Sequence, residues 1–536
     1  MNMENDLELL LQLGGAIHLK EEKKERTIFN NIFGGNKNNE KVSYLNTDEF
    51  FIDIYDYYYK GGFCTIIVSE ITEILAHMFG IIFMIFIFIL LDWGKILQCG
   101  TNNEIKDCGE LHNYINPKSP NSFYILSLII SLIFTVCKII LFIYNYKNIL
   151  YIHKFYKNNL EISSKDLQTM TWPQVINIMS KNQKINLTIC EITNRILRKE
   201  NYYIGLINKD IFKINNKFYT KQLEINIQYA LSDLKNLNSE KLKRKFILYG
   251  LFNLIFSIFI FIYILIYFLA SNIDDLYSNK NIGTRKYSLL SKWKFRDYNE
   301  LQHFFEQRIN KSIKHSYEYL KQFPSPIIEI VCKFICLISG AFIGFLLILS
   351  ILDESILLYV RLFDRTLIFY TGVFGAISAT SRSFLKTPEN KVYDPNGIMK
   401  KIFKHTHYMP NHWNNKCNTY DTRDEFLDLF PYTIIIFLFD LISVITTPII
   451  LIFILPKTSS DIVNFIKFNT THTKTIGNIC SFAKFDEEEN NDKKIQRSKS
   501  GFFENHGIDK TESINNLFTM LEPIDEKNSM MYSSFI

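Results

Sequence analysis

The sequence predicts an all-α polytopic membrane protein with substantial helical parts outside the bilayer. Hydrophobic residues make up 47% of the 536 residues, including 46 Phe and 30 Tyr, which exceeds what one soluble core needs. Charged residues still make up 21%, so the apolar residues must be gathered into blocks that polar stretches separate. A third observation argues against a β-rich protein, because no alternating strand pattern with hairpin turns stands out along the chain.

Six apolar blocks approach or exceed the roughly 20 residues that a helix needs to cross a hydrocarbon core. They lie near residues 66–91, 123–146, 246–270, 327–352, 365–385 and 430–455. The first 60 residues are polar and contain no apolar run that ends in small residues. No cleavable signal peptide is therefore predicted, and the first block is expected to act as its own insertion signal.

The charges of the connecting segments predict their side of the membrane, since cytosolic segments carry an excess of Lys and Arg. Residues 92–122 hold 3 basic and 4 acidic residues, whereas residues 146–245 hold 18 basic and 8 acidic ones. Residues 271–326 hold 10 basic and 6 acidic residues, whereas residues 353–364 hold one basic and three acidic ones. The segments 92–122 and 353–364 are therefore predicted to be lumenal, and the other two cytosolic.

Two of the six blocks are predicted to be re-entrant membrane hairpins, which leaves four transmembrane helices. The block 246–270 lies between two cytosolic segments, so it must enter and leave the bilayer on one face. The block 430–455 carries Asp440 at its middle and is interrupted by Pro448. Six full spans remain an alternative, and both topologies leave the two termini cytosolic.

This topology divides the chain into eight regions. They are a cytosolic N-terminal region (1–65); the first two spans with their lumenal loop (66–146); a cytosolic helical region (147–245); the first re-entrant hairpin (246–270); a basic cytosolic segment (271–326); the third and fourth spans with a short lumenal turn (327–385); cytosolic helices that contain the second hairpin (386–485); and a C-terminal tail (486–536). The tail is acidic at first and then rich in Ser, Asn and Lys, which predicts disorder.

The sequence does not support an enzyme. It contains no GxxxxGKS/T, GxGxxG, GxSxG or HExxH motif, so we predict no catalytic residues and no cofactor. The densest histidine cluster comprises His405, His407 and His412. Together with the nearby Cys417, these residues could serve as metal ligands. Their spacing favours the packing of imidazoles and aromatic rings at a helix end, and no metal is predicted.

The basic excess indicates lipid rather than nucleic acid as a partner. The net charge is +6, but the Lys and Arg residues lie mainly between apolar blocks. Charge in such places contacts anionic lipid headgroups or sets topology. Cys99 and Cys108 are the two cysteines of the predicted lumenal loop, where a disulfide between them is one hypothesis and two free thiols are the other.

Ionisable residues inside the apolar blocks are candidate functional residues, because a charge in hydrocarbon is costly and normally faces a partner or a wet cavity. Glu329 and Lys333 are four residues apart, so on a helix they can pair with each other. Lys138 and Arg382 can face such a cavity or extend to the headgroups instead. Asp440 lies in the predicted second hairpin.

The segment SKWKFRDYNEL (291–301) is the strongest candidate for a functional surface. Lys292, Lys294 and Arg296 alternate with two aromatic residues, an arrangement that suits a membrane interface. If the charged side chains instead line a groove between helices, the groove would be wet. Such a groove could pass a phospholipid headgroup while the acyl tails stay in the bilayer. Both interpretations are open at this point.

Eight motifs occur in a fixed order with the apolar blocks between them. They are IYDYYYKGGF (54–63), TWPQV (171–175), RILRKENYYIGLINKDI (195–211), SKWKFRDYNEL (291–301), SRSFL (381–385), HTHYMPNHW (405–413), TRDEF (422–426) and CSFAKFD (480–486). In this arrangement the chain resembles the autophagy-related protein nine family of multispanning autophagy membrane proteins. The similarity covers roughly residues 45–486.

The resemblance implies a domain-swapped homotrimer of four spanning and two re-entrant segments, with a central pore and lateral branches that open to the bilayer. It implies an ATP-independent phospholipid scramblase that supports autophagosome formation and expansion, with an autophagy-related lipid-transfer protein as a partner. The implied location is Golgi-derived and endosomal cytoplasmic vesicles and the preautophagosomal or phagophore membrane.

Matched position by position, the family stretches nearest the cavities fall on two places in this chain. They correspond to Lys292, Lys294, Arg296, Asn299 and Glu300, and to Arg382; Thr380 and Ser381 lie beside Arg382 on the same short stretch and could supply hydroxyls for headgroup contact. The resemblance therefore implies that these residues line the lipid path.

Two other functions compete with scrambling. A membrane scaffold or tether that shapes vesicles and recruits partners is the alternative, with lipid transport incidental. An ion channel or solute transporter is disfavoured, because the apolar blocks show no ring-forming filter sequence or acidic relay.

Overall fold

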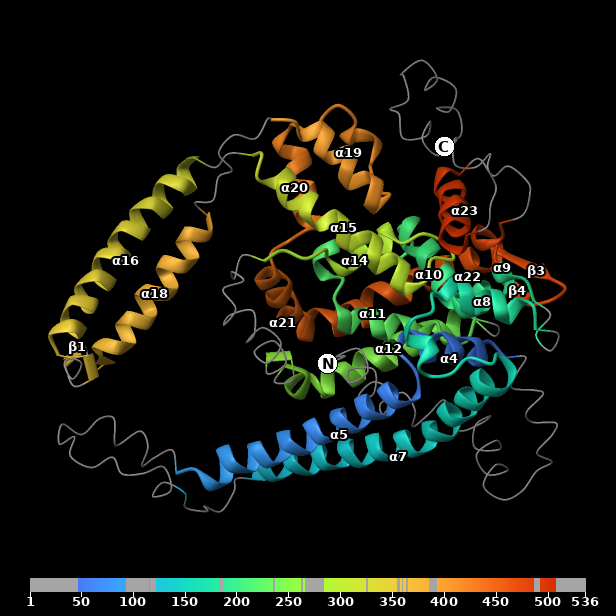
Figure 1. Cartoon of the computed structure of the whole chain (residues 1–536), viewed down its shortest axis with the longest axis horizontal. Coiled ribbons are helices and arrows are strands. Elements are labelled where there is room, and N and C mark those ends of the chain that lie inside the picture. The colour runs from blue at the N-terminus through green and yellow to red at the C-terminus, as the bar shows by residue number, and fades with distance from the viewer. Residues whose placement is uncertain are drawn as a thin grey trace. The chain divides into compact units, whose positions relative to one another are not determined.

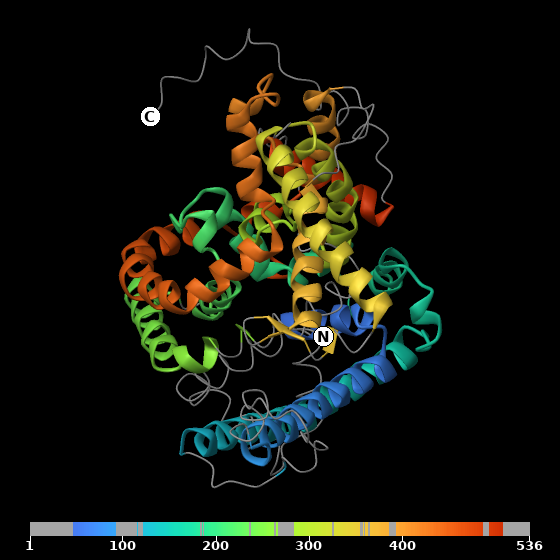
Figure 2. The same ribbon diagram turned by 90° about the vertical axis from the view of Figure 1, so that its left-hand side faces the viewer.

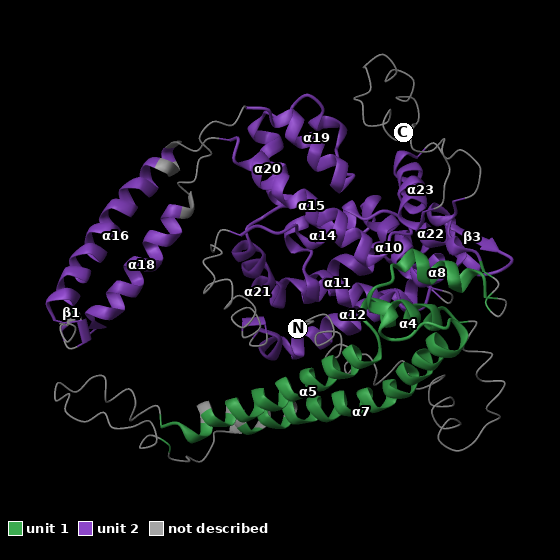
Figure 3. Cartoon of the chain, in the orientation of Figure 1, with its two compact units in different colours: residues 1–187, 362–364 green, residues 188–361, 365–536 purple. Residues whose placement is uncertain are grey.

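The computed structural model of the chain is drawn in Figure 1 and turned by 90° in Figure 2. It describes residues 47–92, 115, 122–182, 185, 187–234, 237–261, 264–265, 284–323, 326–353, 357–358, 360–362, 365–384, 393–485 and 492–507. The chain divides into two compact units (Figure 3). Unit 1 is residues 1–187 with 362–364, and unit 2 is residues 188–361 with 365–536.

Unit 1 is helical. Its elements are α4 (Asp48–Tyr59), α5 (Phe63–Ile85), the π-helical turn η1 (Phe86–Leu90), α7 (Ser122–Asn159), the 3-10 turn η3 (Asp166–Gln168) and α8 (Trp172–Ser180). α4 begins where the Thr47 hydroxyl accepts a hydrogen bond from the Phe50 N–H. The chain turns from α4 into α5 at Gly61 and Gly62, whose φ angles of +78° and +93° disfavour residues with a Cβ.

An aromatic cluster holds α4 against its neighbours in unit 1. The Phe50 and Phe155 rings meet edge to face at 5.1 Å between centroids, and the Tyr55 and Trp172 rings do the same at 5.1 Å. Trp172 is completely buried. The burial of these large rings explains why the tyrosine-rich motif at 54–63 packs inward.

α5 and α7 lie side by side (Figure 1, Figure 2). Their outward side chains are large and apolar, and Leu75, Phe79 and Ile140 are 56%, 65% and 59% exposed. Contiguous apolar surface of this kind calls for a lipid or protein covering. In length and composition Phe63–Phe83 and Ser131–Asn159 can cross a membrane.

Unit 2 is also mostly helical. After α8 the described chain forms α9 (Ile189–Ile196), α10 (Arg198–Asn208), η4 (Asn216–Phe218), α11 (Lys221–Ala230), α12 (Ser239–Ile255), α14 (Leu289–Phe295), α15 (Gln302–Leu320), α16 (Pro326–Leu352), β1 (Arg361–Leu362, of which Leu362 belongs to unit 1), β2 (Arg365–Thr366), α18 (Leu367–Phe384), α19 (Pro395–Thr406), η5 (Asn411–Trp413), α20 (Tyr420–Leu429), α21 (Thr433–Ile449), η6 (Ile450–Ile454), α22 (Leu455–Phe468), β3 (Thr470–Thr473), β4 (Gly477–Cys480), η7 (Ser481–Ala483) and α23 (Lys493–His506). β3 and β4 pair antiparallel, from Thr470 with Cys480 to Thr473 with Gly477.

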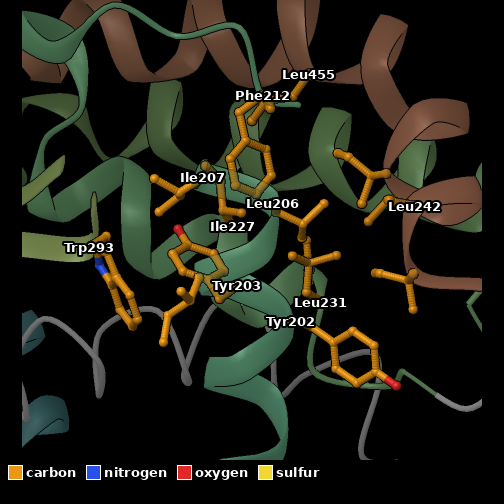
Figure 4. Close-up of a cluster of buried hydrophobic side chains, with 14 of the residues drawn as sticks. Tyr202, Tyr203, Leu206, Ile207, Phe212, Ile227, Leu231, Leu242, Trp293 and Leu455 are labelled. Atoms are coloured by element: carbon orange, nitrogen blue, oxygen red, sulfur yellow. The ribbon is translucent and has the colours of Figure 1, made fainter. Parts of the chain in front are cut away.

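The larger core of unit 2 joins α10, α11, α12 and α22, with Trp293 added from α14 (Figure 4). Leu206, Ile227 and Leu242 in this core are completely buried. A second core joins α14, α15, α19 and α20, where the Tyr319 and Phe426 rings meet edge to face at 5.2 Å. These two cores meet at α14, so the segment 291–301 begins between them.

α16 and α18 pack on each other as an apolar hairpin. The Phe342 and Phe374 rings stack at 4.6 Å, and the small residues Ser339 and Ser378 are buried between the helices. Small side chains let two membrane helices approach closely. The outward surface is apolar, with Leu337 70% exposed.

Among the described helices, four stretches are long and apolar enough to cross a membrane. Phe63–Phe83, Ser131–Asn159 and Ile330–Leu352 coincide with blocks predicted to span. The fourth, Thr433–Phe468, overlaps the block predicted to re-enter, whereas the predicted fourth span is the 18-residue helix α18 beside α16. Several apolar helices suit a multi-pass membrane protein.

The sequence predicts that Pro448 interrupts the apolar block 430–455, but no helix ends at this residue. Pro448 lies inside α21, and the helical backbone continues through the π-helical turn η6 into α22. Proline lacks an N–H and crowds the carbonyl four residues earlier, so one helical hydrogen bond is lost while the helix continues. Re-entry of this block into the bilayer stays a prediction.

The block 246–270 is not one straight helix within its described part. α12 ends at Ile255, the backbone turns at Phe256, and a second helical stretch covers residues 257–261. A break of this kind is what a hairpin needs, although its predicted re-entry also stays a prediction.

The expectation of disorder throughout 486–536 is wrong for residues 493–506, which form α23. The Asp492 side chain caps the start of this helix, and Gly507 at φ +63° ends it. Ile495 and Phe502 are 5% and 3% exposed, so the helix buries an apolar face. The sequence did not reveal this face, because only a few apolar residues form it within a stretch of polar composition.

Gly250→Ala should destabilise unit 2, because α12 passes close to η6 at this position. A Cβ on Gly250 would lie 2.6 Å from Ile452 Cγ1 and 3.2 Å from Leu451 Cβ. We expect a loss of about 1–3 kcal/mol, the usual cost of overpacking, measured as a lower melting temperature of the protein in detergent.

Gly501→Ala in α23 is the matched control. Its Cβ would meet no heavy atom within 4 Å, and alanine is the better helix former. The control should melt at or slightly above the wild-type temperature. If Gly250→Ala also melts like wild type, the close approach of α12 and η6 is wrong.

Candidate functional site

The segment 291–301 forms most of α14 and the loop that follows it. The Ser288 hydroxyl starts the helix by accepting a hydrogen bond from the Ser291 N–H. Lys292 is exposed and Lys294 is half-buried. Further along, Arg296, Asn299 and Glu300 are 6%, 1% and 7% exposed. The predicted path residues of this segment therefore separate into an accessible pair and a buried group of three.

Glu300 is held by a bidentate ion pair with Arg308 of α15. The Arg308 Nε and Nη2 groups donate to the two carboxylate oxygens, each at 2.7 Å. Arg308 also donates to the main-chain carbonyls of Phe295 and His405, so it joins the ends of α14 and α19. Burial lowers the pKa of Arg308, but the carboxylates of Glu300 and Asp297 outweigh it and raise the pKa.

Asp297 pairs with His407 at the end of α19. The Asp297 Oδ2 lies 2.6 Å from His407 Nδ1, and His407 adopts a left-handed conformation with φ +56°. Burial raises the pKa of Asp297, but His407 and Arg308 outweigh that effect and hold the pKa well below its usual range. The carboxylate is therefore ionised inside the protein at neutral pH.

Arg296 and Asn299 attach the same loop to α10 and η7. Arg296 Nη2 lies 2.6 Å from Glu200 Oε2. Asn299 adopts the left-handed conformation with φ +57°, which asparagine tolerates better than most residues. Its amide donates to the Ala483 carbonyl at 2.8 Å and accepts from Asn201 Nδ2 at 2.8 Å. In this structure the polar groups of these two residues are directed to protein partners.

α23 closes the network from the C-terminal side. Lys494 Nζ donates to the Lys294 carbonyl at 2.9 Å, and Arg497 Nη1 donates to the His407 carbonyl at 2.6 Å. The Ser498 hydroxyl accepts from the Tyr298 N–H at 3.1 Å. The sequence contained little signal for this docking, because the partners lie 90 to 200 residues apart.

The residues assigned on α18 have different surroundings. Thr380 and Arg382 are exposed, and Ser381 is 7% exposed. The Thr380 hydroxyl donates to the Ala376 carbonyl at 2.8 Å, one turn back along the helix. Arg382 lies in the last turn, where a cation complements the helix dipole. A lipid-path role for these three residues stays a prediction.

The histidine cluster is dispersed among different partners. His407 meets Asp297, and His412 Nε2 lies 2.6 Å from Glu425 Oε2. His405 stacks on His315 with ring centroids 6.3 Å apart. Among the described residues no group of three or more His, Cys, Asp or Glu side chains is placed to hold a metal ion.

The charge inside the second span has partners that sequence reasoning missed. Lys138 on α7 is 8% exposed, and its Nζ lies 3.3 Å from Glu73 Oε2 and 2.9 Å from His77 Nε2, both on α5. Glu73 and His77 are four residues apart within the first apolar block, which was the available signal. Cys99, Cys108 and the side chain of Glu329 lie outside the described residues.

Residues 39–486 match the family described as autophagy protein ATG9. This chain belongs to the ATG9 family. The resemblance found in the eight motifs is thereby confirmed, and the match ends before α23.

Relatives and a solved structure agree with this assignment. The chain is 32% identical to autophagy-related protein 9 of Dictyostelium discoideum over 503 residues, covering 88% of this chain and 70% of that protein. It is 33% identical to the Arabidopsis thaliana protein of the same name over 512 residues, covering 86% and 57%. The cryo-EM structure of Schizosaccharomyces pombe Atg9 matches with a TM-score of 0.61 and 28% identity, covering 82% of this chain and 99% of that one.

The chain of this ATG9 family member spans little more than half of the Arabidopsis relative. Because it belongs to this family, the chain is an autophagy protein, and its structure contains several apolar helices. The activity and partners of the longer relatives are proposals for this chain.

Glu300→Gln should destabilise the 291–301 loop strongly, because it leaves the buried Arg308 cation without its bidentate carboxylate. Breaking a buried ion pair from one side costs about 3–5 kcal/mol. The measurement is the melting temperature in detergent. Asp424→Asn is the control, since its partner Arg423 forms an exposed pair with side chains 60% and 25% exposed, worth at most about 1 kcal/mol. Equal losses for the two variants would rule out the buried pair as a main support.

The stability of the protein should depend on pH through Lys494. Burial lowers the pKa of Lys494 to about 8. An unfolded lysine titrates near 10.4, so between roughly pH 8 and pH 10 the unfolded chain holds more protons than the folded one. The cost of burying this ammonium therefore falls as the pH rises through that window. We expect the melting temperature of wild type, relative to Lys494→Met, to improve from neutral to alkaline pH, and a constant difference would contradict this.

Proposed function

We propose that this chain is an ATP-independent phospholipid scramblase of the autophagy machinery. It would redistribute lipids between the leaflets of autophagic vesicles and the growing phagophore, supporting autophagosome formation. The observation that carries the proposal is the combination, in one ATG9 family member, of exposed apolar helices and ionisable residues held among them. The apolar surface calls for a lipid or protein covering, and the ionisable side chains can bind a lipid headgroup.

The mechanism follows from the cost of moving a headgroup between leaflets. A phosphate and an ammonium lose their hydration in hydrocarbon, and this desolvation is the barrier. Polar side chains along a protein surface replace part of the lost hydration and lower the barrier equally in both directions. Lipids then flow down their own concentration difference, so the process needs no ATP.

We assign direct headgroup contact to the accessible residues of the predicted path. Lys292, Thr380 and Arg382 are exposed, and Lys294 is half-buried. In this proposal the buried Arg296, Asn299 and Glu300 position the loop that presents the two lysines.

The proposed assembly is a domain-swapped homotrimer with re-entrant segments at 246–270 and 430–455 and both termini in the cytosol. Its proposed location is Golgi-derived and endosomal vesicles and the preautophagosomal membrane, where an autophagy-related lipid-transfer protein would supply lipid. The exposed apolar faces of the α5–α7 and α16–α18 hairpins support such an assembly, because neighbouring subunits or lipid must cover them.

A membrane scaffold is the second candidate, and one observation favours it. Three of the assigned path residues, Arg296, Asn299 and Glu300, are engaged inside the protein, so family motifs here serve the fold. A scaffold would shape vesicles and recruit partners without essential lipid transport.

Scrambling is tested with purified protein in liposomes that carry a fluorescent phospholipid and contain neither ATP nor calcium. Dithionite destroys the fluorescence of the outer leaflet. We expect quenching well beyond half, absent from empty liposomes and not caused by dithionite entry. Quenching that stops near half in vesicles that contain the protein would leave the scaffold as the better function.

Arg382→Ala separates a path residue from a structural one, because its side chain is exposed at the end of α18. Scrambling should slow severalfold while the melting temperature stays unchanged. Arg365→Ala is the matched control, since Arg365 is exposed just before the start of the same helix. An unchanged rate for Arg382→Ala would remove this residue from the path.

A further inference from the structure

The buried charge cluster between α5 and α7 occupies the middle of a candidate membrane span. Glu73 is the central residue of Phe63–Phe83, about 15 Å from either end at 1.5 Å per residue. His77 follows one turn later on the same face, and Lys138 reaches both from α7 at 3.3 Å and 2.9 Å. Three ionisable groups from two helices therefore meet beside the middle of the candidate span Phe63–Phe83.

The cluster is enclosed by aromatic and aliphatic side chains. The Phe134 ring lies 5.2 Å from the His77 ring and 5.9 Å from Lys138 Nζ. The side chains of Lys138 and Glu73 are 8% and 11% exposed. Several other side chains of the two helices are apolar and point outward: Leu75, Met78, Leu132, Ile133, Val136 and Ile140 are 46% to 59% exposed.

Stability alone does not account for this cluster. Apolar side chains of similar volume usually hold two helices together as well as a buried ion pair does, or better. An ionisable group at this depth is costly, and such groups normally mark the route of a polar substrate. The α16–α18 hairpin shows that two helices of this chain can pack through apolar and small side chains. Its helices are joined by the stacked rings of Phe342 and Phe374 and by small buried serines.

The cluster matches the chemistry of a zwitterionic phospholipid headgroup. Lys138 supplies N–H donors for phosphate oxygens and is positioned by His77 Nε2, which accepts from its ammonium, and Glu73 supplies a carboxylate for the ammonium of choline or ethanolamine. A headgroup that displaces the internal ion pair leaves every charge paired, because the phosphate takes the lysine and the ammonium takes the glutamate. The exchange therefore avoids an isolated charge in hydrocarbon.

We propose that Glu73, His77 and Lys138 form an intramembrane transfer site for zwitterionic phospholipid headgroups on the α5–α7 hairpin. The proposal rests on the proposed scramblase function and adds a site in unit 1 to the assigned residues at 291–301 and 380–382. The internal Glu73–Lys138 pair closes the site between transfer events. Each headgroup opens it by exchanging partners.

The test compares scrambling rates of the full chain in liposomes of phosphatidylcholine and phosphatidylethanolamine. Glu73→Gln combined with Lys138→Met removes both charges without leaving either unpaired. We expect this variant to scramble at least tenfold more slowly, a change of about 1.4 kcal/mol in the barrier. Glu73→Lys combined with Lys138→Glu keeps one charge of each sign and should stay within about threefold of wild type, about 0.7 kcal/mol.

Thr135→Val is the matched control. Thr135 is buried on α7 three residues before Lys138, and its hydroxyl is satisfied by the Ser131 carbonyl. It should scramble like wild type at an unchanged melting temperature. A neutral double variant that also scrambles like wild type overturns the site while the scramblase function stands. A wild type that does not scramble overturns both.

If the variant that combines Glu73→Gln with Lys138→Met does not assemble, a labelling measurement on the wild-type protein tests the same site. The probe is phosphatidylcholine with a photoactivatable diazirine in its headgroup. We expect crosslinks on peptides that contain Glu73, His77 or Lys138. Crosslinks confined to other segments would overturn the site.

Discussion

A charge that leaves water must be neutralised where it lies, and in both units this requirement constrains the packing of the helices that carry buried charges. In unit 2 the Glu300 carboxylate pairs with Arg308, and Arg308 in turn binds the carbonyl ends of α14 and α19. In unit 1 Lys138 meets Glu73 between α5 and α7. Because the partners come from separate elements, neutralising each charge also fixes the positions of the helices that carry it.

The same requirement separates two kinds of polar residue in this ATG9 family member. Arg296, Asn299 and Glu300 have protein partners on several sides, so their contribution to lipid movement would be the position of the loop. Lys292 and Arg382 are exposed and can meet a headgroup without a rearrangement of the core. A motif shared by a family can therefore combine contact residues with residues that hold them in place.

The intramembrane cluster extends this distinction into the bilayer. Glu73, His77 and Lys138 satisfy one another, yet apolar side chains would hold the hairpin equally well. The free-energy cost of burying these ionisable groups is explained if the ion pair exchanges its partners with a lipid headgroup. Lipid transfer would then use residues of unit 1 as well as the segment 291–301 of unit 2.

The sequence by itself determined the family and the apolar blocks, because these are properties of contiguous residues. An apolar run such as Phe63–Phe83 is visible without knowing its neighbours. The tertiary structure decided which way the polar residues face. It placed Asn299 against Asn201, Lys494 against Lys294 and Lys138 against Glu73, over separations of 98, 200 and 65 residues. It also carried the helix past Pro448 through a π-helical turn and formed α23 in a stretch of polar composition. Such outcomes depend on which groups, distant in the sequence, neutralise or cover one another. The local sequence pattern does not specify that pairing.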